Sequence, residues 1–256
     1  MEGTPLADAD SGAASKGGEQ TSDETTIMAP NAIARGIFSS MGETSGHGQQ
    51  KRARKVHAHA PTNNFSAAYF RKFYLTAATR VVTAAEMRGR AALIASALKQ
   101  CQIPVRRILD AGCGIGLLRK PFAEIYPAAR YVGLEASDYL CRKYHWTRGS
   151  VIDFKPKRPS DLAVCYDVLQ YLDDRHSGIA IANLARLCRG ALYFTVLTRQ
   201  DWLHNCDRKR TDADVHLRSA AWYRARLRRG FREIGAGFWL ARHAPLTIWE
   251  LETTGR

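Results

Sequence analysis

The sequence lacks any apolar run long enough to cross a membrane. It has 256 residues, of which 45% are hydrophobic, but these fall in short runs, whereas a spanning helix needs about 20 consecutive apolar residues. The first residues contain too many acids and too few bases for a secretory or transit peptide. We therefore expect a soluble, cytoplasmic protein that has no membrane partner.

The cysteines lack the spacing of a metal site or a disulfide framework. There are six of them, and they form no C-x-x-C pair and no cluster with histidine. We expect free thiols, no bound metal and a reducing compartment. The six positions are Cys101, Cys113, Cys141, Cys165, Cys188 and Cys206.

Large apolar residues are scarce in the first quarter of the chain. Gly, Ser, Thr, Ala, Asp and Glu dominate residues 1–63, and such a segment cannot bury enough surface to offset the entropy lost on ordering. We predict a disordered tail over residues 1–63 and one folded domain over residues 64–256.

Positive charge is unevenly distributed. The formal net charge is +14, yet residues 1–50 hold only two basic side chains against seven acidic ones. The basic runs Arg208–Arg210 and Arg224–Arg232 either belong to a solvated surface or attract nucleic acid. Because no aromatic RNA-binding motif is interleaved with them, the first interpretation is favoured.

Hydrophobic periodicity predicts helices first and then an alternation of strands and helices. An apolar stripe from Phe65 to Ala85 indicates one helix, and Arg88–Gln100 indicates a second that ends before Pro104. The predicted strands are Arg107–Ala111, Tyr131–Glu135, His145–Arg148, Leu162–Tyr166 and Ala191–Leu197. Later helices are predicted at Ser137–Lys143, at His176–Arg189 closed by Gly190, and at Ser219–Arg229.

Short apolar strands that alternate with helices are typical of a parallel sheet covered on both faces. Two further strand-like runs, Phe231–Arg242 and Leu246–Leu251, lie too close together in sequence to be parallel. The sequence therefore predicts an α/β fold: a doubly wound, seven-stranded, mostly parallel sheet with an antiparallel last strand pair and helices on both faces.

Alternating glycines follow the first predicted strand. The stretch Asp110-Ala-Gly112-Cys-Gly114-Ile-Gly116 leads directly into a helix. Glycines remove the Cβ atoms that would keep a ligand from the backbone, and the start of the helix offers free N–H groups. The pattern predicts a site for an anionic group such as the carboxylate of a bound amino acid.

This pattern resembles motif I of the class I, Rossmann-like methyltransferases. A dinucleotide site would place a glycine at Leu117, whereas the resemblance rests on G-x-G-x-G preceded by Asp110. It implies that the cofactor is S-adenosylmethionine. It also implies that Asp110, Gly112, Gly114 and Gly116 help to hold the cofactor.

Glu135 ends the next predicted strand, about twenty residues after the glycines. A carboxylate there can accept hydrogen bonds from two ribose hydroxyls, and the resemblance implies that role. Further on, the family often has an acid after a glycine, where Ser150 stands here, so Asp153 is an alternative. The resemblance places Ser150 and Val151 beside the adenine.

The fourth predicted strand is followed by Asp167 and Val168. The resemblance places both residues beside the transferable methyl group. The Asn-Pro-Pro-Tyr or Asp-Pro-Pro-Tyr tetrapeptide that holds planar amino nitrogens is absent, as is the Pro-Cys nucleophile of cytosine C5 methylation. Methylation of adenine or glutamine nitrogens and of cytosine carbon is therefore disfavoured.

A polar loop over residues 198–218 lies at the carboxyl ends of the predicted strands. It contains His204 and His216, the candidates for a general base. Taken singly, a histidine in such a loop is more often a surface or capping residue than a catalytic one. The aromatic segment with Tyr69 and Tyr74 either covers the cofactor or packs in the core.

We expect a methyltransferase that acts on an oxygen or nitrogen atom of a small molecule or of an exposed protein side chain. Two alternatives stay open at this point. One is an RNA methyltransferase that uses the basic runs, and the other is a non-catalytic binding protein with the same fold.

Overall fold

A computed structural model describes residues 65–254 of the chain. The predicted disordered tail, residues 1–63, lies outside the described residues. Among residues 65–254, none of the helices combines the length and the apolar character that crossing a membrane requires.

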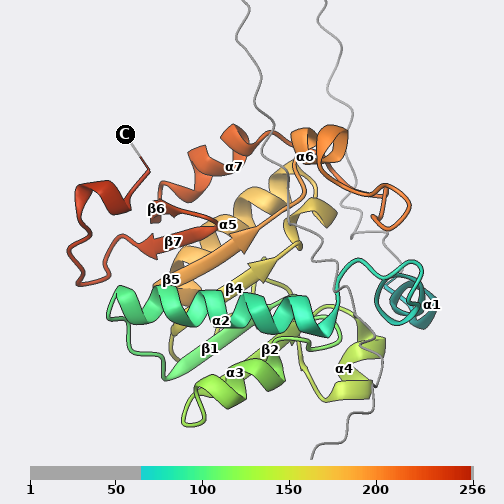
Figure 1. Cartoon of the computed structure of the whole chain (residues 1–256), viewed down its shortest axis with the longest axis horizontal. Coiled ribbons are helices and arrows are strands. Elements are labelled where there is room, and N and C mark those ends of the chain that lie inside the picture. The colour runs from blue at the N-terminus through green and yellow to red at the C-terminus, as the bar shows by residue number, and fades with distance from the viewer. Residues whose placement is uncertain (1–64, 255–256) are drawn as a thin grey trace, which may run out of the picture. The chain divides into compact units, whose positions relative to one another are not determined.

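A seven-stranded sheet with the order β3-β2-β1-β4-β5-β7-β6 organises the described residues (Figure 1). Strands β1 to β5 pair in parallel, whereas β7 is antiparallel to both of its neighbours, β5 and β6. The predicted fold class is confirmed. The strands are β1 (Arg107–Ala111), β2 (Arg130–Glu135), β3 (Thr147–Arg148), β4 (Ser160–Tyr166), β5 (Cys188–Thr195), β6 (Phe231–Gly235) and β7 (Phe238–Ala241).

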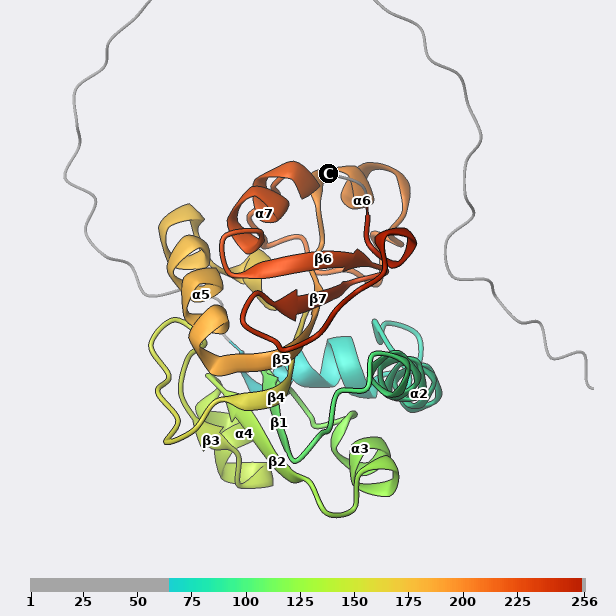
Figure 2. The same cartoon turned by 90° about the vertical axis from the view of Figure 1, so that its left-hand side faces the viewer.

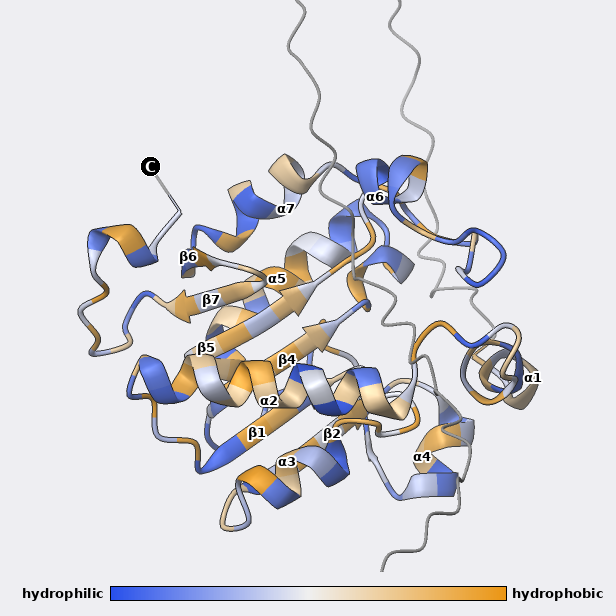
Figure 3. Cartoon of the chain, viewed as in Figure 1, coloured by the Kyte–Doolittle hydropathy of each residue, from blue (hydrophilic) through white to orange (hydrophobic). Residues whose placement is uncertain are grey.

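Helices cover both faces of the sheet, with α2 and α3 on one side and α5 and α7 on the other (Figure 2). Successive residues of a buried strand point to opposite faces, so Ile108 packs with α2 and α3 while Leu109 packs with α5 and α7. The helices are α1 (Ala67–Phe70), α2 (Ala84–Gln100), α3 (Arg119–Ile125), α4 (Asp138–Tyr144), α5 (Asp174–Leu187), α6 (Arg199–His204) and α7 (Ala220–Leu227). The central strands are mostly apolar (Figure 3).

The predicted helix from Phe65 to Ala85 is wrong. The chain instead forms the single turn α1, the π-helical turn η1 (Arg71–Leu75) and a connection in which Val81 is exposed. A new helix then begins at Ala84, because the Thr83 side chain accepts a bond from the Glu86 amide and the Glu86 carboxylate accepts one from Thr83. The sequence prediction missed this capping box and began the second helix at Arg88.

The last strand pair also lies elsewhere in the sequence than predicted. Both of its strands lie within the first predicted run, because the stretch Gly235-Ala236-Gly237 has positive φ at all three residues and turns the chain back on itself. The second run, Leu246–Leu251, forms no strand and leads into the 3₁₀ turn η3 (Glu250–Glu252).

Gly190 does not close α5 as predicted. It lies inside β5, where a Cβ atom would come within 2.2 Å of the Asp161 carbonyl oxygen, so the glycine permits close strand pairing rather than a helix end. The polar loop after β5 contains a short helix, α6, which the prediction missed. Thr198 and Asp201 cap its start with reciprocal hydrogen bonds.

Candidate functional site

The three glycines after β1 all adopt the left-handed backbone region. Their φ angles are +78° at Gly112, +54° at Gly114 and +79° at Gly116, a region in which other L-residues are strained. The loop crosses the carboxyl end of β2, because the amides of Gly112 and Cys113 both donate to the Leu134 carbonyl, at 2.8 and 3.1 Å.

The space beside each glycine differs. A Cβ atom on Gly112 would lie 2.4 Å from Val168 Cγ2, and one on Gly116 would lie 2.4 Å from Trp146 Cζ2. At Gly114 a Cβ atom would meet nothing within 4 Å. The outer two glycines are therefore required by packing, whereas the middle one leaves open space where a ligand can approach the backbone.

Asp110 lies under this loop and is 3% exposed. The Tyr131 hydroxyl donates a hydrogen bond to its carboxylate. Burial raises the pKa of Asp110 to about 7; the Tyr131 bond opposes the shift and the charge of Glu135 adds to it.

Glu135 connects the end of β2 to the glycine loop. One carboxylate oxygen accepts from the Gly114 amide at 2.8 Å, and the other accepts from the amides of Ala136 and Ser137 at 2.9 Å each. Burial raises the pKa of Glu135, and these amide bonds oppose the rise. Because a carboxylate offers about four lone-pair positions, it can still accept a bond from a sugar hydroxyl.

The segment predicted beside the adenine also reaches Glu135, whose carbonyl accepts a bond of 2.9 Å from the Gly149 amide. The Ser150 hydroxyl accepts from the Ile152 amide at 3.2 Å, so it stabilises the local turn. Val151 is buried and packs with the core cluster that includes Leu134.

Asp167 and Val168 lie at the carboxyl end of β4, next to the loop. Asp167 has a positive φ of +55°, and its amide donates to the Thr195 carbonyl at 3.0 Å. Its carboxylate accepts from the Thr195 hydroxyl at 3.2 Å, and burial raises its pKa. Since Val168 packs against Gly112, the structure brings this pair and the glycine motif together.

The two predicted bases lie in the polar loop, and both are exposed. His204 ends α6. The His216 amide donates to the Gln170 carbonyl at 2.7 Å, which holds this part of the loop beside the 3₁₀ turn η2 (Leu169–Tyr171) that follows β4. Within residues 65–254 neither imidazole ring is hydrogen-bonded to Asp167. Their catalytic role stays a prediction.

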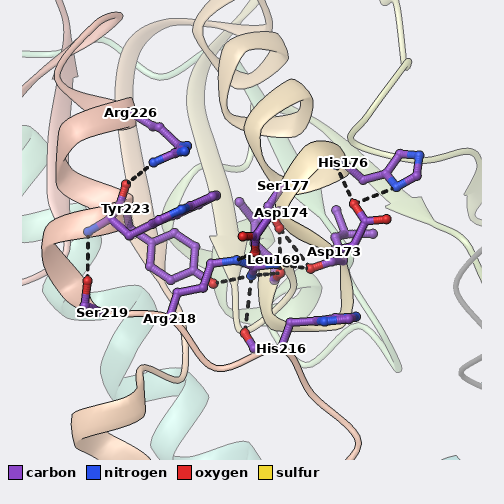
Figure 4. A network of polar contacts seen from close by, with 12 residues as sticks. Leu169, Asp173, Asp174, His176, Ser177, His216, Arg218, Ser219, Tyr223 and Arg226 are labelled. Atoms are coloured by element: carbon purple, nitrogen blue, oxygen red, sulfur yellow. Dashed lines mark hydrogen bonds and ion pairs between the residues drawn. The ribbon is translucent and has the colours of Figure 1, made fainter. Parts of the chain in front are cut away.

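Arg218 anchors this loop, and no pattern in the sequence predicted that role. Its buried guanidinium bonds to the Asp174 carboxylate at 2.7 Å, to the Tyr223 hydroxyl at 2.8 Å and to the carbonyls of Leu169 and Leu172 (Figure 4). Both carbonyls belong to the turn after β4, so Arg218 connects the polar loop to the candidate site.

The aromatic N-terminal segment contacts the site from two sides. The Tyr69 and Tyr171 hydroxyls share a hydrogen bond of 2.8 Å, and the Phe65 carbonyl accepts from the Ser137 hydroxyl at 2.7 Å. Burial raises the pKa of Tyr74, and the charges of Asp167 and Glu135 raise it further. Hydrogen bonds thus connect this segment to the turn after β4 and to Ser137, two residues after Glu135.

The basic run around α7 is largely occupied within the fold. Arg224 and Arg228 form ion pairs of 2.7 and 2.9 Å with Glu233, and the Arg226 guanidinium lies 3.5 Å from the centre of the Trp222 ring. In the other basic run, Arg210 donates to the Arg80 carbonyl. Nucleic-acid binding by these runs stays a prediction.

Residues 83–239 match the family described as "Methyltransferase domain". The chain belongs to this methyltransferase family. The predicted family, the enzyme class and the cofactor S-adenosylmethionine are thereby confirmed, and a non-catalytic binding protein is disfavoured. No curated protein sequence matches the methyltransferase.

Solved structures resemble the methyltransferase in fold. The PH0226 protein from Pyrococcus horikoshii OT3 has a TM-score of 0.50 and 14% identity, covering 68% of this chain and 96% of its own. DesVI from Streptomyces venezuelae has a TM-score of 0.47 and 18% identity, with coverages of 61% and 91%. The N-methyltransferase NodS from Bradyrhizobium japonicum WM9, solved with S-adenosylhomocysteine, has a TM-score of 0.44 and 18% identity, with coverages of 60% and 87%.

Proposed function

We propose that this enzyme transfers the methyl group of S-adenosylmethionine to an oxygen or nitrogen atom of a small molecule or of an exposed protein side chain. The observation that carries the assignment of the site is the open space at Gly114, where a Cβ atom would meet nothing within 4 Å. The Glu135 carboxylate borders it, 2.8 Å from the Gly114 amide.

The residues around this space suit the parts of the cofactor. The amides of the glycine loop, Gly112 to Gly116, suit the amino-acid part, with Asp110 supporting the loop from below. Glu135 suits the ribose hydroxyls, and Ser150 with Val151 suits the adenine. Asp167 and Val168 then border the sulfur and the transferable methyl group, because Val168 packs against Gly112.

When bound, S-adenosylmethionine supplies a methyl group on a positively charged sulfur that is already an activated leaving group. The enzyme therefore has to orient the acceptor in line with the carbon–sulfur bond, exclude water and remove one proton from the acceptor. The acceptor's lone pair forms the new bond to carbon, and the electrons of the broken bond stay on sulfur.

We assign the proton removal to His216 or His204. Of the two, His216 is better supported, because its peptide is held against the turn after β4 by the bond to Gln170. The buried carboxylate of Asp167 is a third group that faces this region, and its raised pKa makes it a stronger base than an ordinary aspartate.

Transfer of a labelled methyl group into a cell extract tests the proposal. The label is expected in a small-molecule or protein fraction, and His216→Gln is expected to reduce the rate by about ten-fold to a hundred-fold. The matched control is His243→Gln, because His243 is exposed and lies after β7, outside the site. Label that appears only in RNA, with a rate that falls steeply as salt is added, would overturn the proposed acceptor class.

A further inference from the structure

Arg90 belongs to α2, and its side chain reaches the carboxyl ends of β4 and β5. Its guanidinium is 4.6 Å from the centre of the Tyr166 ring, and its Nη1 atom donates to the Tyr193 hydroxyl at 2.7 Å. Tyr166 ends β4 and immediately precedes Asp167. Arg90 therefore occupies the same edge of the sheet as the candidate site, on the side covered by α2.

The charge of Arg90 has no paired carboxylate among residues 65–254, where no Asp or Glu oxygen comes within the 4.0 Å of an ion pair. Its Nε atom is buried and has no hydrogen-bond partner. A buried donor without an acceptor is unfavourable. Such a group is stabilised when an anion binds to it.

Two other arginines with buried guanidinium nitrogens differ from Arg90. Arg218 has a carboxylate, a hydroxyl and several carbonyls as partners (Figure 4), so it holds the fold together. Arg232 also has a buried Nε atom without a partner. It lies near the start of β6, however, at the opposite edge of the sheet from the site.

The nearby carboxylates are already engaged. Glu86 accepts from the amide and the hydroxyl of Thr83 at 2.6 and 2.8 Å. Asp167 accepts from the Thr195 hydroxyl. The Thr83 hydrogen bonds lower the pKa of the Glu86 carboxyl against the effect of burial, and the charges of Arg210 and Arg90 lower it further. Neither Glu86 nor Asp167 forms an ion pair with Arg90, whose Nε donor is left for an added anion.

We propose that Arg90 binds an anionic group of the methyl acceptor, a carboxylate or a phosphate. This inference rests on the proposed function, because it takes the space beside Asp167 as the acceptor's position. The planar guanidinium can bond to two oxygens of either group. The rings of Tyr166 and Tyr193 hold the guanidinium in place, so that it can bind the acceptor through this anionic group.

The experiment separates the extract's small molecules by anion exchange at neutral pH and supplies each fraction with enzyme and labelled cofactor. We expect labelled product from the retained, anionic fraction. Arg90→Met is expected to raise the KM for that fraction at least ten-fold while kcat changes by less than two-fold. Arg90→Lys keeps the positive charge but not the planar guanidinium, so its KM should be intermediate. Arg88→Met is the matched control, because Arg88 is exposed and pairs only with Glu124 on the surface.

Direct binding keeps the inference testable if no fraction is labelled. Benzoate and phenyl phosphate are titrated into enzyme saturated with S-adenosylhomocysteine, with benzamide as the neutral comparison, and the stronger binder of the first two identifies the anion. Weaker binding to Arg90→Met than to the natural enzyme supports the inference. Label only in the unretained fraction, or equal anion binding by the two proteins, would overturn the role of Arg90 but not methyl transfer. Failure of S-adenosylhomocysteine to bind would overturn the proposed function.

Discussion

The indole N–H of Trp146 donates a hydrogen bond of 2.9 Å to the carbonyl oxygen of Gly114, the middle glycine of the loop after β1. The same ring fills the space beside Gly116 and Gly133, where added Cβ atoms would lie 2.4 and 2.7 Å from it. Trp146 thus supports the glycine loop through both a hydrogen bond and packing.

Replacing Trp146 tests whether this support matters for the cofactor. Trp146→Phe keeps an aromatic ring but removes the N–H donor, so the Gly114 carbonyl loses its partner at a cost of about 1 kcal/mol. We expect a lower unfolding temperature and several-fold weaker binding of S-adenosylhomocysteine by calorimetry. Trp249→Phe is the control, because Trp249 is 77% exposed. Unchanged affinity in Trp146→Phe would show that the loop keeps its shape without the indole.

The three glycines should respond differently to alanine. In Gly116→Ala the new Cβ atom clashes with Trp146, so we expect the free energy of unfolding to fall by about 2 kcal/mol or more. In Gly114→Ala the Cβ atom enters open space, so stability should fall by about 1 kcal/mol for the left-handed backbone alone. Gly114→Ala should instead lose cofactor affinity. Urea unfolding and calorimetry on both variants measure the two effects, and the opposite order would refute the assignment of the open side.

Asp110 makes stability depend on pH. Its pKa is about 7 in the folded protein and near 4 in an unfolded chain. As the pH rises, the Asp110 carboxyl ionises in the unfolded chain before it ionises in the folded protein. The free energy of unfolding is therefore unaffected by Asp110 below about pH 4 and falls as the pH rises from 4 to 7. Asp110→Asn cannot ionise. Between pH 4 and pH 7 the variant should therefore gain stability relative to the natural enzyme, by on the order of a few kcal/mol.

Urea unfolding of the two proteins without cofactor, at pH 5 and at pH 8, measures this difference. The Asn side chain can still accept the Tyr131 hydrogen bond, so a general loss of packing is not expected to mask it. A difference in stability that is the same at both pH values would contradict the assigned pKa shift.

Arg218 and Asp174 form an ion pair of 2.7 Å whose partners differ in burial, with side-chain exposures of 4% and 77%. Removing the buried partner by Arg218→Met leaves the carbonyls of Leu169 and Leu172 unpaired, and we expect a loss of about 3 kcal/mol or more in stability. Removing the exposed partner by Asp174→Asn should cost less, because the Asn amide oxygen can still accept a hydrogen bond from Arg218 and the two carbonyls keep their donor. Thermal and urea unfolding compare the two, and similar losses would mean that the ion pair rather than the carbonyl contacts holds the loop.

Local patterns were enough to predict the central part of this site. The strand before Asp110, the spaced glycines and the acid at Glu135 depend on neighbours within a few residues, and the structure has all of them where the sequence placed them. The pairing of Asp110 with Gly133 across parallel strands then brings the glycines and Glu135 together as a consequence of the fold.

Contacts between distant segments were not predictable in the same way. Trp146 reaches Gly114 across 32 positions of the chain, and Arg90 reaches Tyr193 across 103, so no periodicity or motif connects them. The apolar stripe from Phe65 to Ala85 led to a wrong prediction. Its spacing fits one helix, but the reciprocal hydrogen bonds of Thr83 and Glu86 begin a second helix within it. Tertiary packing and helix caps therefore determined the structure where local helix propensity allowed more than one.

Calorimetric titration of S-adenosylhomocysteine into the enzyme and its Glu135→Ala variant tests the site assignment most directly. Glu124→Ala serves as the control, because Glu124 lies on the surface of α3 in ion pairs with Arg88 and Lys120. Our assignment predicts at least ten-fold weaker binding to Glu135→Ala, about 1.4 kcal/mol or more, and natural affinity in the control. Equal affinity in all three proteins would contradict the position of the cofactor between Gly114 and Glu135.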